Sequence, residues 1–176
     1  MKRSVLAFLL ISGLAVTASA ENLIPNGDFK KFDPKNGRPE GWTISRANEV
    51  VEEGPGGTPA LRMTSSYRSK TGAWKGNARV VIPQLPAGKY KFSMKTKGAA
   101  GMIYFFIIPP ADSGVKRVTR DSRKNQMKAL ADGWKYGEYE LDFPKDAAKV
   151  MLVLEGFFSK QGEYEYLADL KIEPVK

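Results

Sequence analysis

The chain has 176 residues, with 28 Lys and Arg against 19 Asp and Glu, which gives a formal net charge of +9. It contains no Cys, which excludes a disulfide framework, a thiolate nucleophile and Cys-ligated zinc. It also contains no His, so Ser-His-Asp catalysis and imidazole metal sites are excluded as well.

The first twenty residues have the pattern of an export signal. Two basic residues precede an apolar run over residues 5–16, and Ala-Ser-Ala at residues 18–20 matches a signal-peptidase site. The run is too short to span a bilayer, and no second run of that kind follows. We therefore expect residues 21–176 to be one secreted or periplasmic domain without a membrane span. Removal of two basic residues leaves this domain with a charge of +7.

From residue 42 onward, the hydrophobic pattern predicts strands separated by turns. Short candidate strands come first, at residues 42–45, 49–52, 60–64 and 78–82. In residues 89–95, Tyr, Phe and Met alternate with Lys and Ser, which indicates a strand with one buried and one solvated face. Residues 102–108 are apolar on both faces, and their length and composition favour a central strand.

Residues 111–133 interrupt this pattern with few apolar side chains and many basic ones. The basic residues of the part between 116 and 128 are Lys116, Arg117, Arg120, Arg123, Lys124 and Lys128. Asp121 could cap a short helix that continues through Ala129, and Gly133 would end the segment. The insertion is either a mobile loop or a binding element. As a binding element, its guanidinium and ammonium groups would pair with the anionic groups of a polysaccharide. The alternative is that these basic side chains only form a solvated surface.

The last third of the chain returns to strands. Residues 137–143 alternate between apolar and acidic side chains, and residues 150–154 are apolar on both faces. In residues 164–172, the even-numbered positions are apolar and the odd-numbered ones are mostly charged, with Leu167 as the exception. Many short strands, at a spacing of roughly ten residues and with Gly and Pro in the turns, predict an all-β fold. We expect a jelly-roll β-sandwich of two antiparallel sheets.

Several short motifs carry a family resemblance. They are NLIPNGDF at residues 22–29, PEGW at 39–42, PALRM at 59–63, PAGKYKFS at 86–93, DGWK at 132–135 and YLADL at 166–170. In their order and spacing they resemble the CenC-type carbohydrate-binding modules, the galactose-binding-like jelly rolls of families four and twenty-two. The resemblance covers nearly all of residues 22–174. It implies a module that binds a polysaccharide in a cleft across its concave sheet.

The resemblance also implies ligand-binding residues, because sugar recognition needs aromatic faces and a few polar groups. Trp74 resembles the stacking tryptophan of the family, and packing within the fold is the alternative. Tyr104 and Phe106 alternate with Phe105, so we expect them in the cleft, with core packing as the alternative. Glu155 lies where the xylan-binding family has a cleft glutamate, and an exposed strand end is the alternative.

Two further tryptophans and a calcium site belong to the same resemblance. Trp42 and Trp134 each follow a glycine at a strand start, as the packing tryptophans of the family do. Similar modules often bind a structural calcium ion near residues 26–28 and Asp169. Here Lys30 replaces one of the usual carboxylates. Either calcium binds with fewer acidic ligands, Asp169 among them, or a lysine amine replaces its charge. No other cofactor is expected.

We expect an exported, non-catalytic module that binds a polysaccharide, with an anionic one as an option. Two other classes stay open. The first is a structural or adhesion domain of the envelope that binds protein. The second is a small jelly-roll lyase or glycosidase: a lyase needs no His, whereas a glycosidase needs two carboxylates and Glu155 has no obvious second. Because the chain is exported, nucleic acid is not an expected partner.

Overall fold

The computed structural model of the chain describes residues 21–122 and 127–175, so the predicted export signal at residues 1–20 lies outside the described residues. Strands dominate this part of the chain. The helical segments in it are short 3-10 turns at Pro55–Gly57, Ala111–Ser113 and Ala131–Gly133. Within the described part, no helix is long and apolar enough to cross a membrane. The predicted all-β class is confirmed.

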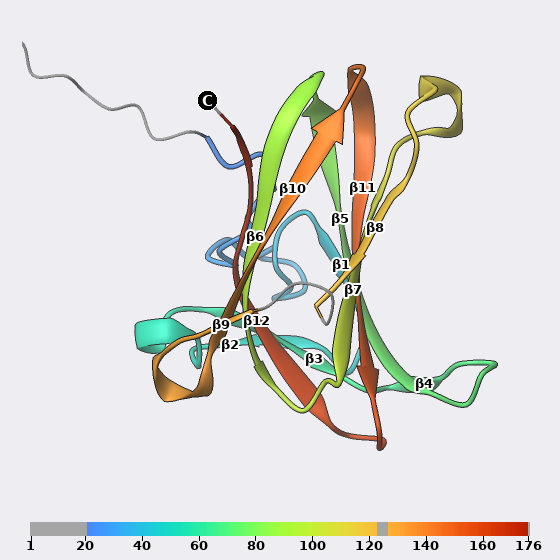
Figure 1. The fold of residues 1–176 in the computed structure, drawn as a ribbon. Helices are drawn as coiled ribbons and strands as arrows, with labels where there is room; N and C mark the ends of the chain where they lie inside the picture. The colour runs from blue at the N-terminus through green and yellow to red at the C-terminus, as the bar shows by residue number, and fades with distance from the viewer. Residues whose placement is uncertain (1–20, 123–126, 176) are drawn as a thin grey trace, which may run out of the picture.

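The strands form two antiparallel sheets (Figure 1). The first, called the β5 sheet, contains in spatial order β1 (Trp42–Ile44), β5 (Trp74–Leu85), β11 (Ala147–Phe158), β7 (Met102–Ile108) and β8 (Val118–Asp121), with β4 (Tyr67–Arg68) also paired to β5. The second, called the β6 sheet, contains β2 (Glu49–Val51), β3 (Ala60–Thr64), β12 (Tyr164–Pro174), β6 (Gly88–Gly98), β10 (Lys135–Phe143) and β9 (Lys128–Ala129). The predicted β-sandwich of two antiparallel sheets is confirmed.

The core lies between the two sheets and follows from the alternation along each strand. On β7, Ile103, Phe105 and Ile107 are at most 2% exposed. Phe92 on β6 is also fully buried, and its ring centroid lies 4.3 Å from that of Phe105. A chain of this length can bury enough apolar surface in such a core to fold without disulfides.

The observed strands contain or overlap all the predicted ones. β3 and β7 coincide with the predicted ranges 60–64 and 102–108. β5 extends well beyond the predicted range 78–82, because it pairs along its whole length with β11. The sequence pattern did not predict β4, β8 or β9, which are short strands with few apolar side chains.

The predicted helix from Asp121 through Ala129 is wrong for the residues that the structure describes. Asp121 ends β8, which pairs antiparallel with β7, and Ala129 belongs to β9, which pairs with β10. Without these partners, β7 and β10 would present unpaired backbone groups along an open edge. Residues 123–126, which include two of the basic residues of this segment, lie outside the described part.

The alternation predicted for β12 is interrupted by a β-bulge near Asp169, where φ is +50°. The bulge adds a residue to one strand and thereby reverses which positions face the core. Ahead of the bulge Leu167 is fully buried, and beyond it Leu170 is. Leu167 is therefore no exception to the pattern. By the same shift, Glu165 lies on the core side, whereas the sequence pattern predicted it on the solvated face.

Glu165 is a buried carboxyl at one end of the sandwich. It is 5% exposed, and one of its oxygens accepts a hydrogen bond from the backbone N–H of Ala100 at 3.0 Å. Burial raises the pKa of Glu165 to about 7, although the hydrogen bond from Ala100 acts in the opposite direction. The folded protein therefore holds this carboxyl partly protonated near neutral pH.

Replacing Glu165 with glutamine should remove a pH-dependent contribution to stability. Because the pKa of about 7 in the folded state lies above the ordinary 4.5, the folded state binds the proton more tightly. The contribution is complete below about pH 4.5 and is lost as the pH rises to about 7. We expect wild type to lose about 2–3 kcal/mol over this range relative to Glu165→Gln. Urea unfolding at several pH values measures this difference, and parallel curves for the two proteins would contradict it.

Candidate functional site

The outer face of the β5 sheet, which points away from the core, brings predicted site residues together. On β7, Tyr104 and Phe106 alternate with the buried Phe105 and therefore lie on this face. β11 is the neighbouring strand, and it pairs Glu155 with Tyr104. Phe157 lies two residues further along β11 and faces the same way. Three of the four predicted ligand-binding residues are thus neighbours.

The rings of Tyr104, Phe106 and Phe157 form what we call the aromatic cluster. Tyr104 and Phe106 have ring centroids 5.8 Å apart and planes only 9° from parallel. Phe157 meets Tyr104 edge to face, with the centroids 5.2 Å apart and the planes at 66°. All three side chains are partly exposed. Partly exposed aromatic rings on a sheet face offer apolar surface of the kind that packs against a sugar ring.

Two cations lie over rings of the aromatic cluster. Lys75 on β5 places its Nζ 4.1 Å from the centroid of Phe157. Arg117, just ahead of β8, places its Cζ 4.3 Å from the centroid of Phe106. Both distances are within the range of a cation–π interaction. Two rings of the aromatic cluster are therefore each in contact with a cationic side chain.

Glu155 is held by protein groups at the border of the aromatic cluster. Its Oε2 lies 2.9 Å from Lys75 Nζ, and its Oε1 accepts a hydrogen bond from the Tyr67 hydroxyl at 3.0 Å. Asn77 Nδ2 donates to the same hydroxyl oxygen at 3.4 Å. Burial, and to a smaller degree the Glu155 carboxylate, raise the pKa of Tyr67, so its hydroxyl remains a donor. The network positions these polar groups beside the rings.

Sequence reasoning missed several members of this face. Phe157 lies two residues after Glu155 on β11 and therefore points to the same face of the sheet. The predicted strand ended at residue 154, so the sequence pattern did not reach Phe157. Lys75 was missed for the same reason on β5, whose predicted range began at residue 78. Tyr67 lies on β4, and only its pairing with Lys75 brings it to the face.

Trp74 lies apart from the other three predicted ligand-binding residues. In the alternation along β5, Trp74 falls on the side of the core positions, whereas Lys75 falls on the outer face. Its cross-strand neighbour on β11 is Phe158, which is 5% exposed. Trp74 itself is partly buried at the start of its strand. Its role as a stacking residue stays a prediction, and the structure does not join it to the aromatic cluster.

The other two tryptophans are buried, as predicted for structural residues. Trp42 is 6% exposed, and its Nε1 donates to the carbonyl oxygen of Pro25 at 3.1 Å. Trp134 is 4% exposed and packs on the outer side of the β6 sheet. There it lies against Tyr166, with ring centroids 6.3 Å apart. Trp134 therefore belongs to a second, smaller apolar cluster and not to the core between the sheets.

The residues implied for a calcium ion are engaged in other interactions. Asp169 lies 2.6 Å from Lys95 Nζ, and Asp28 lies 3.3 Å from Lys30 Nζ. The Asn26 side chain bonds to backbone groups of the loop that follows it. The described residues include no group of three or more His, Cys, Asp or Glu suited to a metal ion. With lysine ammonium groups on both carboxylates, this set does not fit a calcium ion.

Comparisons with known proteins agree with the fold. No protein-family model matches the chain, and no curated protein matches it either. Among solved structures, TmCBM61 in complex with β-1,4-galactotriose is similar, with 16% identity and a TM-score of 0.57 over 89% of this chain and 100% of that one. A CBM4 structure has 19% identity and a TM-score of 0.53 over 86% of this chain and 99% of that one.

A third similar structure is the CBM22-1 xylan-binding domain of Paenibacillus barcinonensis Xyn10C. It has 16% identity and a TM-score of 0.55 over 90% of this chain and 97% of that one. At such identities the likeness concerns the fold alone. The chain therefore has the fold of carbohydrate-binding modules, in agreement with the resemblance seen in the sequence.

Proposed function

We propose that the chain is an exported, non-catalytic module that binds a polysaccharide on the outer face of the β5 sheet. The observation that carries this proposal is the aromatic cluster, in which Tyr104 and Phe106 present nearly parallel, accessible rings. The polar network around Glu155 borders the rings and supplies groups able to bond sugar hydroxyls. Export is supported by the signal pattern in residues 1–20.

The charges on this face favour an anionic polysaccharide. Glu155 is neutralised by Lys75. Among the described residues, neither Arg79 nor Arg117 has a salt-bridge partner, and both are exposed. A neutral sugar that stacks on Phe106 must displace the Arg117 guanidinium, which costs about 0.5–2 kcal/mol of cation–π energy. A sugar carboxylate or sulfate can instead pair with the displaced guanidinium.

Binding to a polysaccharide panel tests this proposal. We expect polygalacturonate and alginate to be retained more strongly than neutral xylan and galactan in affinity electrophoresis. Added salt should weaken the retention, because exposed charges are screened within about 8 Å at physiological ionic strength. Absence of binding to every polysaccharide would contradict the proposal. Release of new reducing ends would instead indicate cleavage of the polymer.

Arg117→Gln should lower the affinity for polygalacturonate about three- to tenfold, the range expected for one exposed ion pair or cation–π contact. It should also reduce the salt dependence of binding, while the affinity for xylan stays the same or rises. The matched control is Arg120→Gln, because Arg120 is opposite Phe105 and not opposite a residue of the aromatic cluster. Equal losses for both variants would assign the effect to overall charge.

A further inference from the structure

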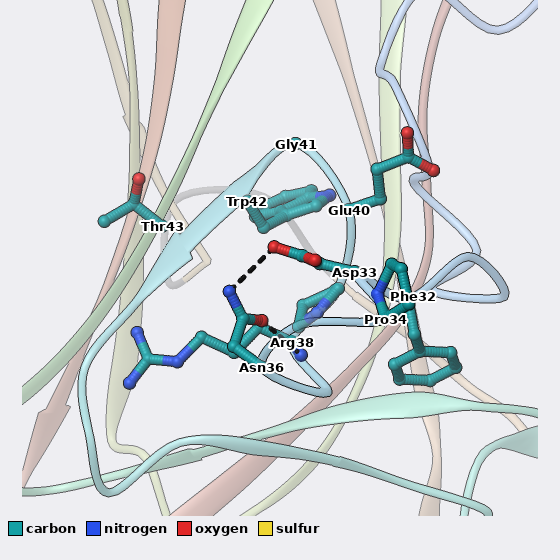
Figure 2. A pocket seen from close by; sticks show the side chains of 10 residues that line it. Phe32, Asp33, Pro34, Asn36, Arg38, Glu40, Gly41, Trp42 and Thr43 are labelled. Atoms are coloured by element: carbon teal, nitrogen blue, oxygen red, sulfur yellow. Dashed lines mark hydrogen bonds between the residues drawn. The ribbon is translucent and has the colours of Figure 1, made fainter.

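A pocket lies beside the β5 sheet, in the loop that precedes β1. It encloses about 580 Å³, and its lining includes Phe32, Asp33, Asn36, Arg38, Trp42 and Thr43 (Figure 2). The loop lies along the free edge of β1, where Arg38 Nη1 donates to the carbonyl oxygen of Ile44 at 3.2 Å. With Glu40, which also lines it, the pocket combines a guanidinium, two carboxylates, an amide, a hydroxyl and aromatic surface.

Hydrogen bonds within the loop hold the pocket in shape. The Asp33 carboxylate accepts bonds from the Lys35 N–H at 2.8 Å and from Asn36 Nδ2 at 2.7 Å. Asn36 Oδ1 in turn accepts a bond from the Arg38 N–H at 2.9 Å. Figure 2 shows the Asp33 and Asn36 side chains turned toward each other. A pocket whose walls are already ordered loses little conformational entropy when a ligand enters.

The base of the loop is anchored to the rest of the fold. Asn26 Nδ2 donates to the carbonyl oxygens of Lys31 and Glu40, at 2.8 and 3.2 Å, and so ties the two ends of the loop together. The buried Trp42 ring packs against Phe29, with the centroids 5.1 Å apart. The pocket is therefore built on the same rigid elements as the sandwich.

Thr43 connects this loop pocket to the outer face of the β5 sheet. It also lines a smaller pocket of about 380 Å³ on that face, together with Asn77, Arg79, Met151 and Val153. Val153 pairs across the sheet with Phe106 of the aromatic cluster. Arg79 pairs with both Val153 and Thr43. A continuous path therefore leads from β7 across β11, β5 and β1 into the loop pocket.

The length of this path exceeds that of the aromatic cluster. From β7 to β1 the sheet has three strand spacings of about 4.8 Å, or about 14 Å in all, and the loop pocket lies beyond β1. A ligand that follows the path must run across the strands. It must also be a chain of several units, because a single sugar cannot reach both ends.

We propose that the loop pocket is a further subsite, which binds sugar units of the same polysaccharide that lies on the aromatic cluster. Phe32 is 43% exposed at this pocket and offers its ring to a sugar. The Arg38 guanidinium and the Thr43 hydroxyl supply polar partners. The inference rests on the proposed function and deepens it: the site selects a long, extended polymer and not a short or terminal fragment.

Isothermal titration with oligogalacturonides of three and eight units tests this inference, with xylo-oligosaccharides of the same lengths in parallel. We expect the octamer to bind wild type at least about tenfold more tightly than the trimer, since one added stacking contact is worth about 1.5 kcal/mol or more. Phe32→Ala should remove most of this advantage and leave trimer binding unchanged. The matched control is Leu130→Ala, because Leu130 is 42% exposed but lies on the side of the β6 sheet.

The outcomes separate the inference from the proposed function. If Phe32→Ala leaves the ratio of octamer to trimer affinity unchanged while Tyr104→Ala weakens both, the subsite is wrong and the aromatic cluster still binds. If neither oligomer series binds wild type, the proposed function fails and the subsite fails with it. Thermal unfolding of Phe32→Ala shows whether the loop remains folded, and Thr43→Leu provides a second variant that removes a polar partner from the path.

Discussion

Replacing Tyr104 with alanine is expected to weaken polysaccharide binding at least about tenfold and to leave the free energy of unfolding within about 1 kcal/mol of wild type. Tyr104 is in the middle of the aromatic cluster, where its ring contacts both Phe106 and Phe157. Loss of an aromatic contact with a ligand costs about 1.5–3 kcal/mol, and each 1.4 kcal/mol corresponds to a factor of ten. Because the ring is partly exposed, its removal leaves no closed cavity.

Phe105→Ala is the matched control for this variant. Phe105 is the next residue on the same strand but is fully buried between the sheets. Its truncation should destabilise the protein by about 3–5 kcal/mol. Affinity electrophoresis and urea unfolding of the two variants measure both quantities. If Tyr104→Ala retains full affinity, or unfolds the protein as Phe105→Ala does, the ligand does not bind at the aromatic cluster.

Trp134→Ala should lower the free energy of unfolding by about 3–5 kcal/mol. Trp134 is 4% exposed, and its removal would uncover Ala60, Tyr166 and Ala168 on the outer side of the β6 sheet. A loss of this size is a large share of the stability of a small domain. The expected result is a pronounced decrease in the midpoint of thermal unfolding, with binding retained at temperatures where the variant is still folded.

Trp74→Ala provides the comparison. Trp74 is only partly buried at the start of β5, so its truncation should cost clearly less stability than that of Trp134. Because Trp74 and Lys75 are consecutive on β5, they point to opposite faces, and Lys75 is on the face of the aromatic cluster. We therefore expect Trp74→Ala to lose less affinity than Tyr104→Ala. A loss of affinity equal to that of Tyr104→Ala would restore Trp74 as a stacking residue. A midpoint for Trp134→Ala close to that of wild type would show that the outer cluster contributes little to stability.

The alternation of side chains allowed much of the fold to be predicted. Tyr104, Phe105 and Phe106 show why: successive residues of a strand point to opposite faces, so one buried position assigns its neighbours. The same local pattern identified the strands of residues 60–64 and 102–108. The buried state of Trp42 and Trp134 also agreed with the positions assigned by resemblance.

Two features that depend on strand pairing could not be predicted. β8 has few apolar side chains, and it forms a strand because the edge of β7 needs hydrogen-bond partners. The bulge near Asp169 changes which residues of β12 face the core, and it exists only in relation to the register with β6. A local pattern contains no information about either partner.

The sequence by itself predicted the fold class and most strands, placed Tyr104 and Phe106 on one face, and through the family resemblance offered Glu155 as a third candidate. Only the tertiary structure added Lys75, Tyr67 and the loop pocket. The physical reason is that periodicity states which residues of one strand share a face, whereas long-range pairing decides which strands are neighbours. Lys75 reaches Glu155 across 80 residues of sequence because β5 and β11 pair in one particular register.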